Sequence, residues 1–376
     1  MQLVTNAVSS APPLPAAPER FTGKPAAVID ELRRISAVDL APMVAEIDKG
    51  AYPGSVLKAY GAAGGYALHL APGHALGPTI ESMSVISETC LSTGFMDWCQ
   101  NTLVWYILNS ENEALKAKLL GPASEGRVLG GTGLSNPMKT IFGIEQMRLK
   151  GTKVEGGYRI KGVLPWVSNL GPDHLFGAVF DTDDGGRVMC LVDCADPAVT
   201  LKPCEPFLAL DGTGTYSVQV RDLFVPQDLI LADPAMPYIK KIRAGFILLQ
   251  AGMAIGLVRD CVRMMEEVRP SLGHVNRFLD VQPEDIAEKL AAIEAEVFEL
   301  AATPYDTSDA FWKRVVAMRL EGGEATVAAA HHAMLHCGAR GYVAAHRCQR
   351  RLREAYFVAI VTPATKQLRK MLAEMA

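Results

Sequence analysis

The chain has 376 residues, of which 49% are hydrophobic and 21% are charged, and its formal net charge is −4 at pH 7. This balance is typical of a globular protein and excludes a disordered chain, and the length predicts two or three domains. The negative charge argues against nucleic acid as a partner, because phosphate binding needs a basic face.

The eight cysteines are scattered along the chain without a C-x-x-C pair. We interpret them as buried, reduced thiols of a cytoplasmic protein. His332 and His336 lie four residues apart but have no third ligand nearby in the sequence, so we predict no metal site. The N-terminus lacks the pattern of a signal peptide, and no uncharged apolar run is long enough for a membrane helix, so we expect no membrane partner.

Residues 1–23 are rich in proline and alanine, which predicts a flexible N-terminal arm. Apolar residues at helical intervals then predict an N-terminal helical domain over residues 24–126. Its expected helices are Pro25–Arg34, Asp39–Asp48, Thr79–Leu91, Phe95–Leu108 and Glu111–Leu120, and Gly121-Pro122 is expected to break the last one.

Residues 127–233 contain short runs of β-branched and aromatic residues, bounded by Gly, Asp and Pro. The turns Glu155-Gly156-Gly157 and Asp183–Gly186 are hairpin signals. We therefore predict a central antiparallel β domain. Its expected strands include Gln146–Leu149, Tyr158–Ile160, Phe176–Phe180, Arg187–Val192, Tyr216–Val220 and Leu223–Val225.

Residues 234–376 predict a C-terminal helix bundle, so the fold class is α+β with the β domain in the middle of the chain. The expected helices are Ile239–Met265, Glu284–Leu300, Asp309–Leu335, Arg347–Val361 and Lys366–Met375. Small residues on the first of them, such as Gly252 and Gly256, permit close helix–helix contact and suit a dimer or tetramer.

The stretch from Gly162 to Ala178 places Trp166, Ser168 and Asn169 at the end of a predicted strand. A flat aromatic side chain beside small polar groups can hold a flat heteroaromatic ring, because the indole covers a face and the polar groups meet the ring edge. The alternative interpretation is a core tryptophan beside an ordinary Ser-Asn turn.

Four segments, in order along the chain, resemble the acyl-CoA dehydrogenase superfamily of flavoproteins. Leu134–Pro137 lies where the family has Thr-Glu-Pro, and Tyr158–Asn169 resembles its strand and turn ending in W-I-T-N. Val220–Pro226 resembles its F-x-D-V-x-V-P segment. Gly338–Tyr342 followed by Arg350–Ala355 resembles G-G-x-G-Y and R-x-x-R-D-A, and it keeps their spacing.

The resemblance implies FAD bound between the β domain and the bundle, usually across a dimer. It places Trp166 near the isoalloxazine, Ser168 at its N5 edge and Ser135 on its pyrimidine side. It also implies that Gly338 and Gly341 approach the ADP half of a neighbouring subunit's cofactor. Arg277 belongs to a shortened version of the loop that meets the pyrophosphate.

The chain also departs from the family pattern. Thr362 stands where the family has its catalytic Glu, and a threonine hydroxyl is no base at neutral pH. A second base position, used by some members, falls in residues 243–257, which contain no carboxylate. Several phosphate contacts are also lost, including a glycine replaced by Ala339, so the departures predict weakly bound FAD.

The first functional hypothesis is an FAD-dependent oxidoreductase that acts on the CH–CH group of an acyl thioester such as an acyl-CoA, with an atypical or missing base. A second is a two-component flavin monooxygenase, which takes reduced flavin from a reductase and activates O₂. The third is a non-catalytic, degenerate subunit.

Expected partners are a small-molecule substrate, a second copy in a homodimer or homotetramer, and a flavin reductase or electron-transfer protein. His331 and His332 are further candidates for side chains near the reacting carbon of the substrate, although their pattern is more typical of ordinary helical residues.

Overall fold

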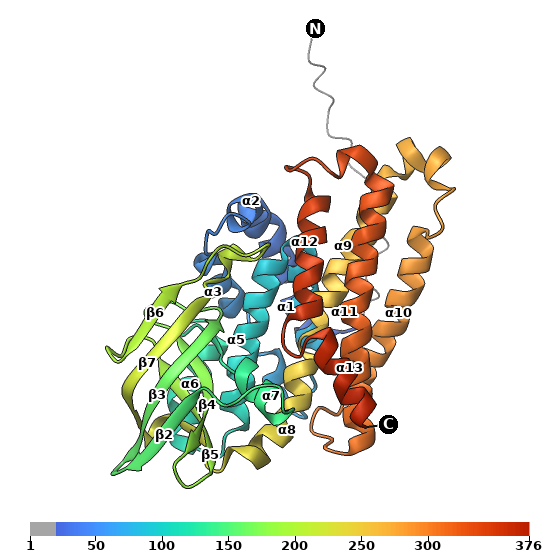
Figure 1. Ribbon diagram of the computed structural model, residues 1–376. Helices are drawn as coiled ribbons and strands as arrows, with labels where there is room; N and C mark the ends of the chain where they lie inside the picture. The colour runs from blue at the N-terminus through green and yellow to red at the C-terminus, as the bar shows by residue number, and fades with distance from the viewer. Residues whose placement is uncertain (1–19, 376) are drawn as a thin grey trace.

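The computed structural model describes residues 20–375, so nearly all of the predicted N-terminal arm lies outside the described residues. In Figure 1 a β-sheet and a bundle of long helices lie side by side, and the N-terminal helices lie against both. Helix α5 passes between the sheet and the bundle. The predicted order of helices, sheet and bundle is confirmed.

The N-terminal part is helical, as predicted, but two boundaries differ. The segment 39–48 is divided into short turns, because Pro42 has no N–H to continue an α-helix. Helix α6 continues through Gly121-Pro122, and Gly126, at φ +69°, closes it instead. The elements are α1 Gly23–Ile35, η1 Ser36–Leu40, η2 Ala41–Met43, α2 Val44–Ile47, α3 Gly54–Ala62, η3 Leu68–Leu70, α4 Gly77–Thr89, α5 Leu91–Asn109 and α6 Glu113–Ser124.

The sheet has eight strands in the order β6-β7-β3-β2-β4-β5-β8, with β1 paired to β4. It is mostly antiparallel, and β1 and β2 each run parallel to β4. Both predicted turns join neighbouring strands, β2 to β3 and β4 to β5. The strands are β1 Gly130–Thr132, β2 Leu149–Val154, β3 Gly157–Val167, β4 Leu175–Thr182, β5 Arg187–Asp193, β6 Val199–Pro203, β7 Tyr216–Pro226 and β8 Ile230–Ala232.

Several strands differ in extent from the prediction. The predicted run Gln146–Leu149 ends where β2 begins, and the two runs between 216 and 225 form one strand, β7. The short strands β1, β6 and β8 were not predicted, nor was the helix α7 Ser135–Ile141, which follows β1. Between β6 and β7 lies the turn η4 Asp211–Thr213, and η5 Gln227–Leu229 follows β7.

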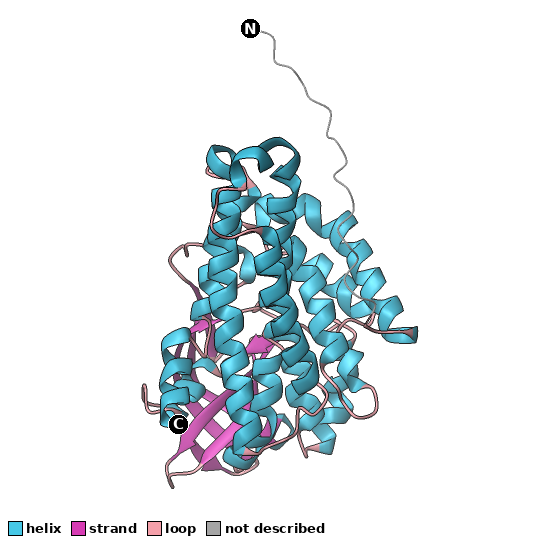
Figure 2. Cartoon of the chain, turned by 90° about the vertical axis from the view of Figure 1, so that its right-hand side faces the viewer, coloured by secondary structure: helices cyan, strands magenta, loops and turns pink. Residues whose placement is uncertain are grey.

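The bundle contains the predicted C-terminal helices, but its first helix is in fact two, which meet at Leu249-Gln250. The pair, Ala235–Asn276, is long and apolar enough to cross a membrane, yet 89% of its most apolar window is buried inside the protein, as in a core helix. Figure 2 shows the bundle helices side by side in front of the sheet. They are α8 Ala235–Leu248, α9 Ala251–Asn276, α10 Pro283–Leu300, α11 Asp309–Cys337, α12 Arg347–Ile360 and α13 Thr365–Glu374, with the turn η6 Gly338–Arg340 after α11.

The small residues of α9 pack against α4 within the same chain. A Cβ atom at Gly252 would lie 2.7 Å from the Met83 Cβ, and one at Gly256 would lie 2.2 Å from the Ser84 carbonyl oxygen. Only glycine permits this approach. Because this face is covered inside the chain, it gives no support to the oligomer that we predicted from it.

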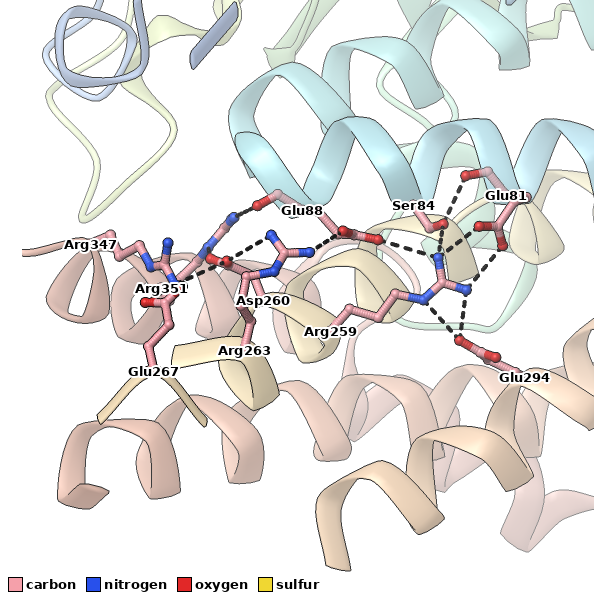
Figure 3. Close-up of polar contacts among 10 residues, drawn as sticks. All are labelled: Glu81, Ser84, Glu88, Arg259, Asp260, Arg263, Glu267, Glu294, Arg347 and Arg351. Atoms are coloured by element: carbon pink, nitrogen blue, oxygen red, sulfur yellow. Dashed lines mark hydrogen bonds and ion pairs between the residues drawn. The ribbon is translucent and has the colours of Figure 1, made fainter. Parts of the chain in front are cut away.

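Helix α9 also carries a buried network of charged groups (Figure 3). The Arg259 guanidinium binds both carboxylate oxygens of Glu81 on α4, at 2.8 and 3.0 Å, and a carboxylate oxygen of Glu294 on α10, at 2.8 Å. The next residue, Asp260, accepts a 2.7 Å hydrogen bond from Arg351 on α12. Two adjacent residues of α9 therefore join three other helices.

We predict that Arg259→Met destabilises the protein by about 3–5 kcal/mol, because it leaves the buried carboxylate of Glu81 without its counter-ion and Glu294 with Arg20 alone. The matched control is Arg314→Met, which removes an exposed arginine bound to Glu296 and Glu299 and is expected to cost less than about 1 kcal/mol. Urea unfolding of both variants measures the difference. Equal losses would show that the buried network does not stabilise the fold.

We also predict that Asp97 makes stability depend on pH. Burial raises the pKa of this α5 carboxyl to about 8, and a hydrogen bond from Asn101 opposes the shift only in part. The folded protein then retains a proton that the unfolded chain releases near pH 4, so the stabilisation is present below pH 4 and is lost as the pH rises toward 8. Asp97→Asn should remove this loss, so the variant gains on the wild type by up to about 1.4 kcal/mol per pH unit between pH 5 and 8. Parallel unfolding profiles across this range would contradict the assignment.

Candidate functional site

The end of β3 carries the predicted ring-binding residues in a fixed turn. Asn169 is fully buried at φ +60°, and its amide donates to the Gly130 carbonyl oxygen at 2.7 Å and accepts from the Tyr52 hydroxyl at 2.6 Å. The Ser168 hydroxyl lies 2.7 Å from that of Thr215. Trp166 is 58% exposed, so it is not the core tryptophan of the alternative interpretation.

The segment that leads to Ser135 runs along the end of β3. A Cβ atom at Gly131 would lie 2.0 Å from the Ser168 carbonyl oxygen, and one at Gly133 would lie 3.0 Å from the Leu164 side chain. Glycine is needed for this close contact between two backbones. Helix α7 begins directly after it, at Ser135.

Ser135 and Thr362 come together although they are 227 residues apart. Their hydroxyl oxygens lie 2.8 Å from each other, which joins the start of α7 to the loop between α12 and α13. Within residues 20–375 neither hydroxyl bonds to a carboxylate. A neutral hydroxyl pair can therefore orient a ligand through hydrogen bonds, but it cannot accept an acidic proton.

Two buried polar side chains hold the Thr362 loop in place. The Gln250 side chain donates to the Thr362 carbonyl oxygen at 2.9 Å and accepts from the Arg319 guanidinium at 2.7 Å. Arg319 also donates to the carbonyl oxygens of Val358 and Val361 at the end of α12. Burial lowers the pKa of Arg319 to about 10, and it forms no ion pair with the part of the chain that the structure describes.

Gln250 and Arg319 are not among the site residues that we predicted from the sequence. The available signal was a single glutamine in the apolar run from Ala244 to Leu257. A polar side chain in such a run must find a partner when it is buried.

Large apolar side chains remain exposed around this region. Leu208 is 67% exposed and Ile360 is 65% exposed. The Arg353 guanidinium on α12 donates to the Leu208 carbonyl oxygen at 2.9 Å, so α12 lies close to the loop before β7. Ile360 lies two turns further along α12 than Arg353, so the two exposed apolar side chains flank the same helix.

The residues predicted to contact the ADP half lie elsewhere, at the far end of α9 and α11. Asn276 donates to the His336 carbonyl oxygen at 3.0 Å, which brings the loop of Arg277 next to Gly338. Arg319 lies beside the Thr362 loop. From Arg319 to Gly338 the distance along α11 is about 28 Å, at 1.5 Å per residue. His331 is exposed and His332 is half-buried, and both lie on α11 about three turns beyond Arg319.

Gly338 and Gly341, at this end of α11, are surrounded differently. Gly338 adopts φ +58°, and no atom lies within 4 Å of a Cβ built there, so its backbone is open to a ligand. A Cβ at Gly341 would lie 2.8 Å from the Cys337 Cβ, so packing within the chain already accounts for that glycine. The exposed Arg277 lies over the ring of its neighbour Phe278, at 4.9 Å.

These residues suit a flavin in two parts. The exposed indole of Trp166 and the hydroxyls of Ser135 and Ser168 could meet the face and the polar edges of a flat ring. Arg277 and the open backbone at Gly338 match a phosphate-bearing half. Along α11, the Thr362 loop beside Arg319 and the Gly338 backbone are about 28 Å apart.

Comparison with known proteins finds a relative over most of the chain. No family model matches the chain. It is 26% identical over 350 residues to the mitochondrial short-chain specific acyl-CoA dehydrogenase of Homo sapiens, which covers 87% of this chain and 84% of that protein.

Solved structures share the fold. A glutaryl-coenzyme A dehydrogenase bound to glutaryl-CoA has a TM-score of 0.84 at 18% identity, over 94% of this chain and 95% of the other. A glutaryl-CoA dehydrogenase from Mycobacterium smegmatis in complex with FADH₂ has a TM-score of 0.73 at 18% identity and covers 94% of both chains. A dibenzothiophene monooxygenase from Paenibacillus sp. A11-2 has a TM-score of 0.75 at 16% identity, over 91% and 95%. The relatedness across most of the chain and the shared fold relate this protein to the acyl-CoA dehydrogenase superfamily.

Proposed function

We propose that the protein is an FAD-dependent oxidoreductase whose flavin ring lies between the end of β3 and the Thr362 loop. The contact of Ser135 with Thr362, beside the strand that presents Trp166, is the observation that carries this proposal. It joins the two chain segments between which the resemblance puts flavin and substrate. A bound flavin would supply the acceptor for a hydride from the substrate.

The substrate we propose is an organic molecule oxidised at a CH–CH bond, as an acyl thioester would be. Removal of the α-proton normally needs a base, and Thr362 cannot serve as one. The loop from Val358 to Lys366 contains no carboxylate. Oxidation of an unactivated acyl chain by this site should therefore be slow.

A second candidate is a flavin monooxygenase that uses reduced flavin and O₂. The neutral hydroxyl pair favours it, because activation of O₂ by reduced flavin needs no carboxylate to remove a substrate proton. A monooxygenase with the same fold supports this alternative by analogy. Flavin binding separates the candidates: tight oxidised FAD supports the dehydrogenase, whereas binding of reduced flavin alone, supplied by a reductase, supports the monooxygenase.

Replacing the hydroxyl by a carboxylate tests the proposed base position. Thr362→Glu should increase oxidation of a short acyl-CoA by about 10²–10⁴-fold, because general-base catalysis has this magnitude. Thr362→Gln matches the size without the base and should give no increase. The measurement is flavin bleaching by butyryl-CoA under anaerobic conditions, with flavin content determined separately. Equal rates for both variants, with flavin bound, would show that Thr362 is not at the base position.

We further propose that two copies of the chain complete each flavin site, since the Thr362 loop lies about 28 Å along α11 from the end where Arg277 is found. Mixing Trp166→Ala with Arg277→Gln protein tests this. Each variant alone should bind FAD weakly. A mixed dimer should regain one intact site, in which Trp166 comes from one copy and Arg277 from the other. No recovery of flavin binding in mixed dimers would mean that both residues of a site come from the same chain, or that one of them does not bind flavin.

We also propose a reducing intracellular location for the protein, on the basis of its cysteines. All eight cysteines are free thiols, and seven of them are buried. Free, buried thiols are typical of proteins from reducing compartments.

A further inference from the structure

Two cysteines face each other across the loop that joins α11 to α12. Cys337 is the last residue of α11, and Cys348 lies in the first turn of α12. Their side chains share a hydrogen bond, although residues 338–347 lie between them in the chain. Figure 1 shows α11 and α12 side by side, with this loop at the upper end of the bundle.

Contacts with two neighbours fix the position of the pair. The Cys348 Sγ atom lies 3.9 Å from the Sδ atom of Met334 on α11. The backbone of Gly341 packs on the same place, because a Cβ atom there would lie 2.8 Å from the Cys337 Cβ and 3.2 Å from the Met334 Sδ. Both cysteines are buried, whereas the loop that covers them is exposed over most of its length. The thiols therefore lie directly beneath a surface loop.

Cys337 differs from the other cysteines of the protein, all of which lie in the described residues. Burial raises the pKa of an isolated thiol, as it does at Cys190, where the pKa is about 12. The pKa of Cys337 is lowered instead, because the Cys348 thiol donates a hydrogen bond to it and the charge of Arg347 lies nearby. The same hydrogen bond raises the pKa of Cys348. A thiol that favours the thiolate beside a second thiol is typical of redox-active cysteine pairs.

Formation of a bond between the two sulfur atoms needs only a local movement of the chain. The sulfur atoms of a disulfide are about 2.05 Å apart, so the two thiols must come closer than in a hydrogen bond. This movement falls on the last turn of α11 and the first turn of α12, not on the interior of either helix. Gly338, which follows Cys337, has open space around its backbone, so the loop has room to adjust.

We propose that Cys337 and Cys348 form a modification site, at which hydrogen peroxide converts the two thiols into a reversible disulfide. The Cys337 thiolate attacks one peroxide oxygen, so an S–O bond forms, the O–O bond breaks and the leaving hydroxide takes a proton from solvent. The Cys348 sulfur then attacks the Cys337 sulfur. The S–S bond forms, the S–O bond breaks, and the proton of Cys348 leaves with the hydroxide as water. The two thiols are oxidised, and one peroxide is reduced to two molecules of water.

The disulfide ties the end of α11 to the start of α12 and so restrains the loop that carries Gly338. In a reducing compartment such a bond is transient, and transient disulfides there are usually catalytic or redox-sensing. The oxidation uses peroxide and the two thiols alone. It therefore stands apart from the proposed flavin chemistry, and the failure of either leaves the other in place.

The test is peptide mapping of the full chain after treatment with hydrogen peroxide. Free thiols are blocked with N-ethylmaleimide in denaturant, and trypsin then cuts after Arg340 and Arg347, between the two cysteines. We expect peptide 320–340 linked to peptide 348–350, with the loss of two hydrogen atoms, and the return of both free thiols after dithiothreitol. Cys337 should lose its thiol at least about tenfold faster than Cys190, because each unit of pKa changes the thiolate fraction tenfold.

Cys348→Ser should abolish the link and leave Cys337 to oxidise to sulfenic and then sulfinic acid. Cys261→Ser is the matched control, since Cys261 is a third cysteine close enough to affect the pKa of Cys348, and the link should survive its loss. A link from either cysteine to Cys261 would overturn the pairing. Two free thiols after peroxide treatment, or sulfinic acid at Cys337 beside a free Cys348 thiol, would overturn the site. The map of the unmodified sequence decides this even if a variant fails to fold.

Discussion

The arrangement of the helices depends on the pair of opposite charges at Arg259 and Asp260 on α9. Consecutive residues of a helix point about 100° apart, so Arg259 reaches α4 and α10 while Asp260 reaches α12. Each charge is buried with its partners, and an unpaired buried charge is strongly unfavourable. The helices can therefore shift relative to α9 only by breaking several ion pairs at once.

This constraint extends to the candidate site through α12. The start of α12 is held by Arg351 on Asp260, and its last turn is held by Arg319 on the carbonyl oxygens of Val358 and Val361. The Thr362 loop leaves directly from that last turn and contacts Gln250, at the junction of α8 and α9. The position of the Thr362 hydroxyl thus follows from buried polar contacts at both ends of one helix.

The sequence predicts most of the helices because long amphipathic segments have a strong period. It misses the break at Leu249-Gln250, where one glutamine is the only polar side chain in a long apolar run. It also misses β1, β6 and β8, which have three to five residues, and of these β1 and β8 pair with strands far along the chain. Short strands carry too few residues for a period to be recognised, and their pairing is a tertiary property.

The site shows a similar division. Ser135, Trp166 and Thr362 were found from their resemblance to family motifs, and the structure places Ser135 in contact with Thr362. Gln250 and Arg319 could not be found in this way, because their roles appear only when α8, α11 and α12 meet.

The buried positive charge of Arg319, next to the Thr362 loop, gives a reason to expect an anionic group near Thr362. Arg319 is a buried cation whose acceptors are neutral: an amide oxygen and two carbonyl groups at the negative end of the α12 dipole. These dipoles offset part of the charge but supply no full counter-charge. A carboxylate at position 362 would complete the balance, and a threonine there leaves the positive potential for whatever anionic group enters the site.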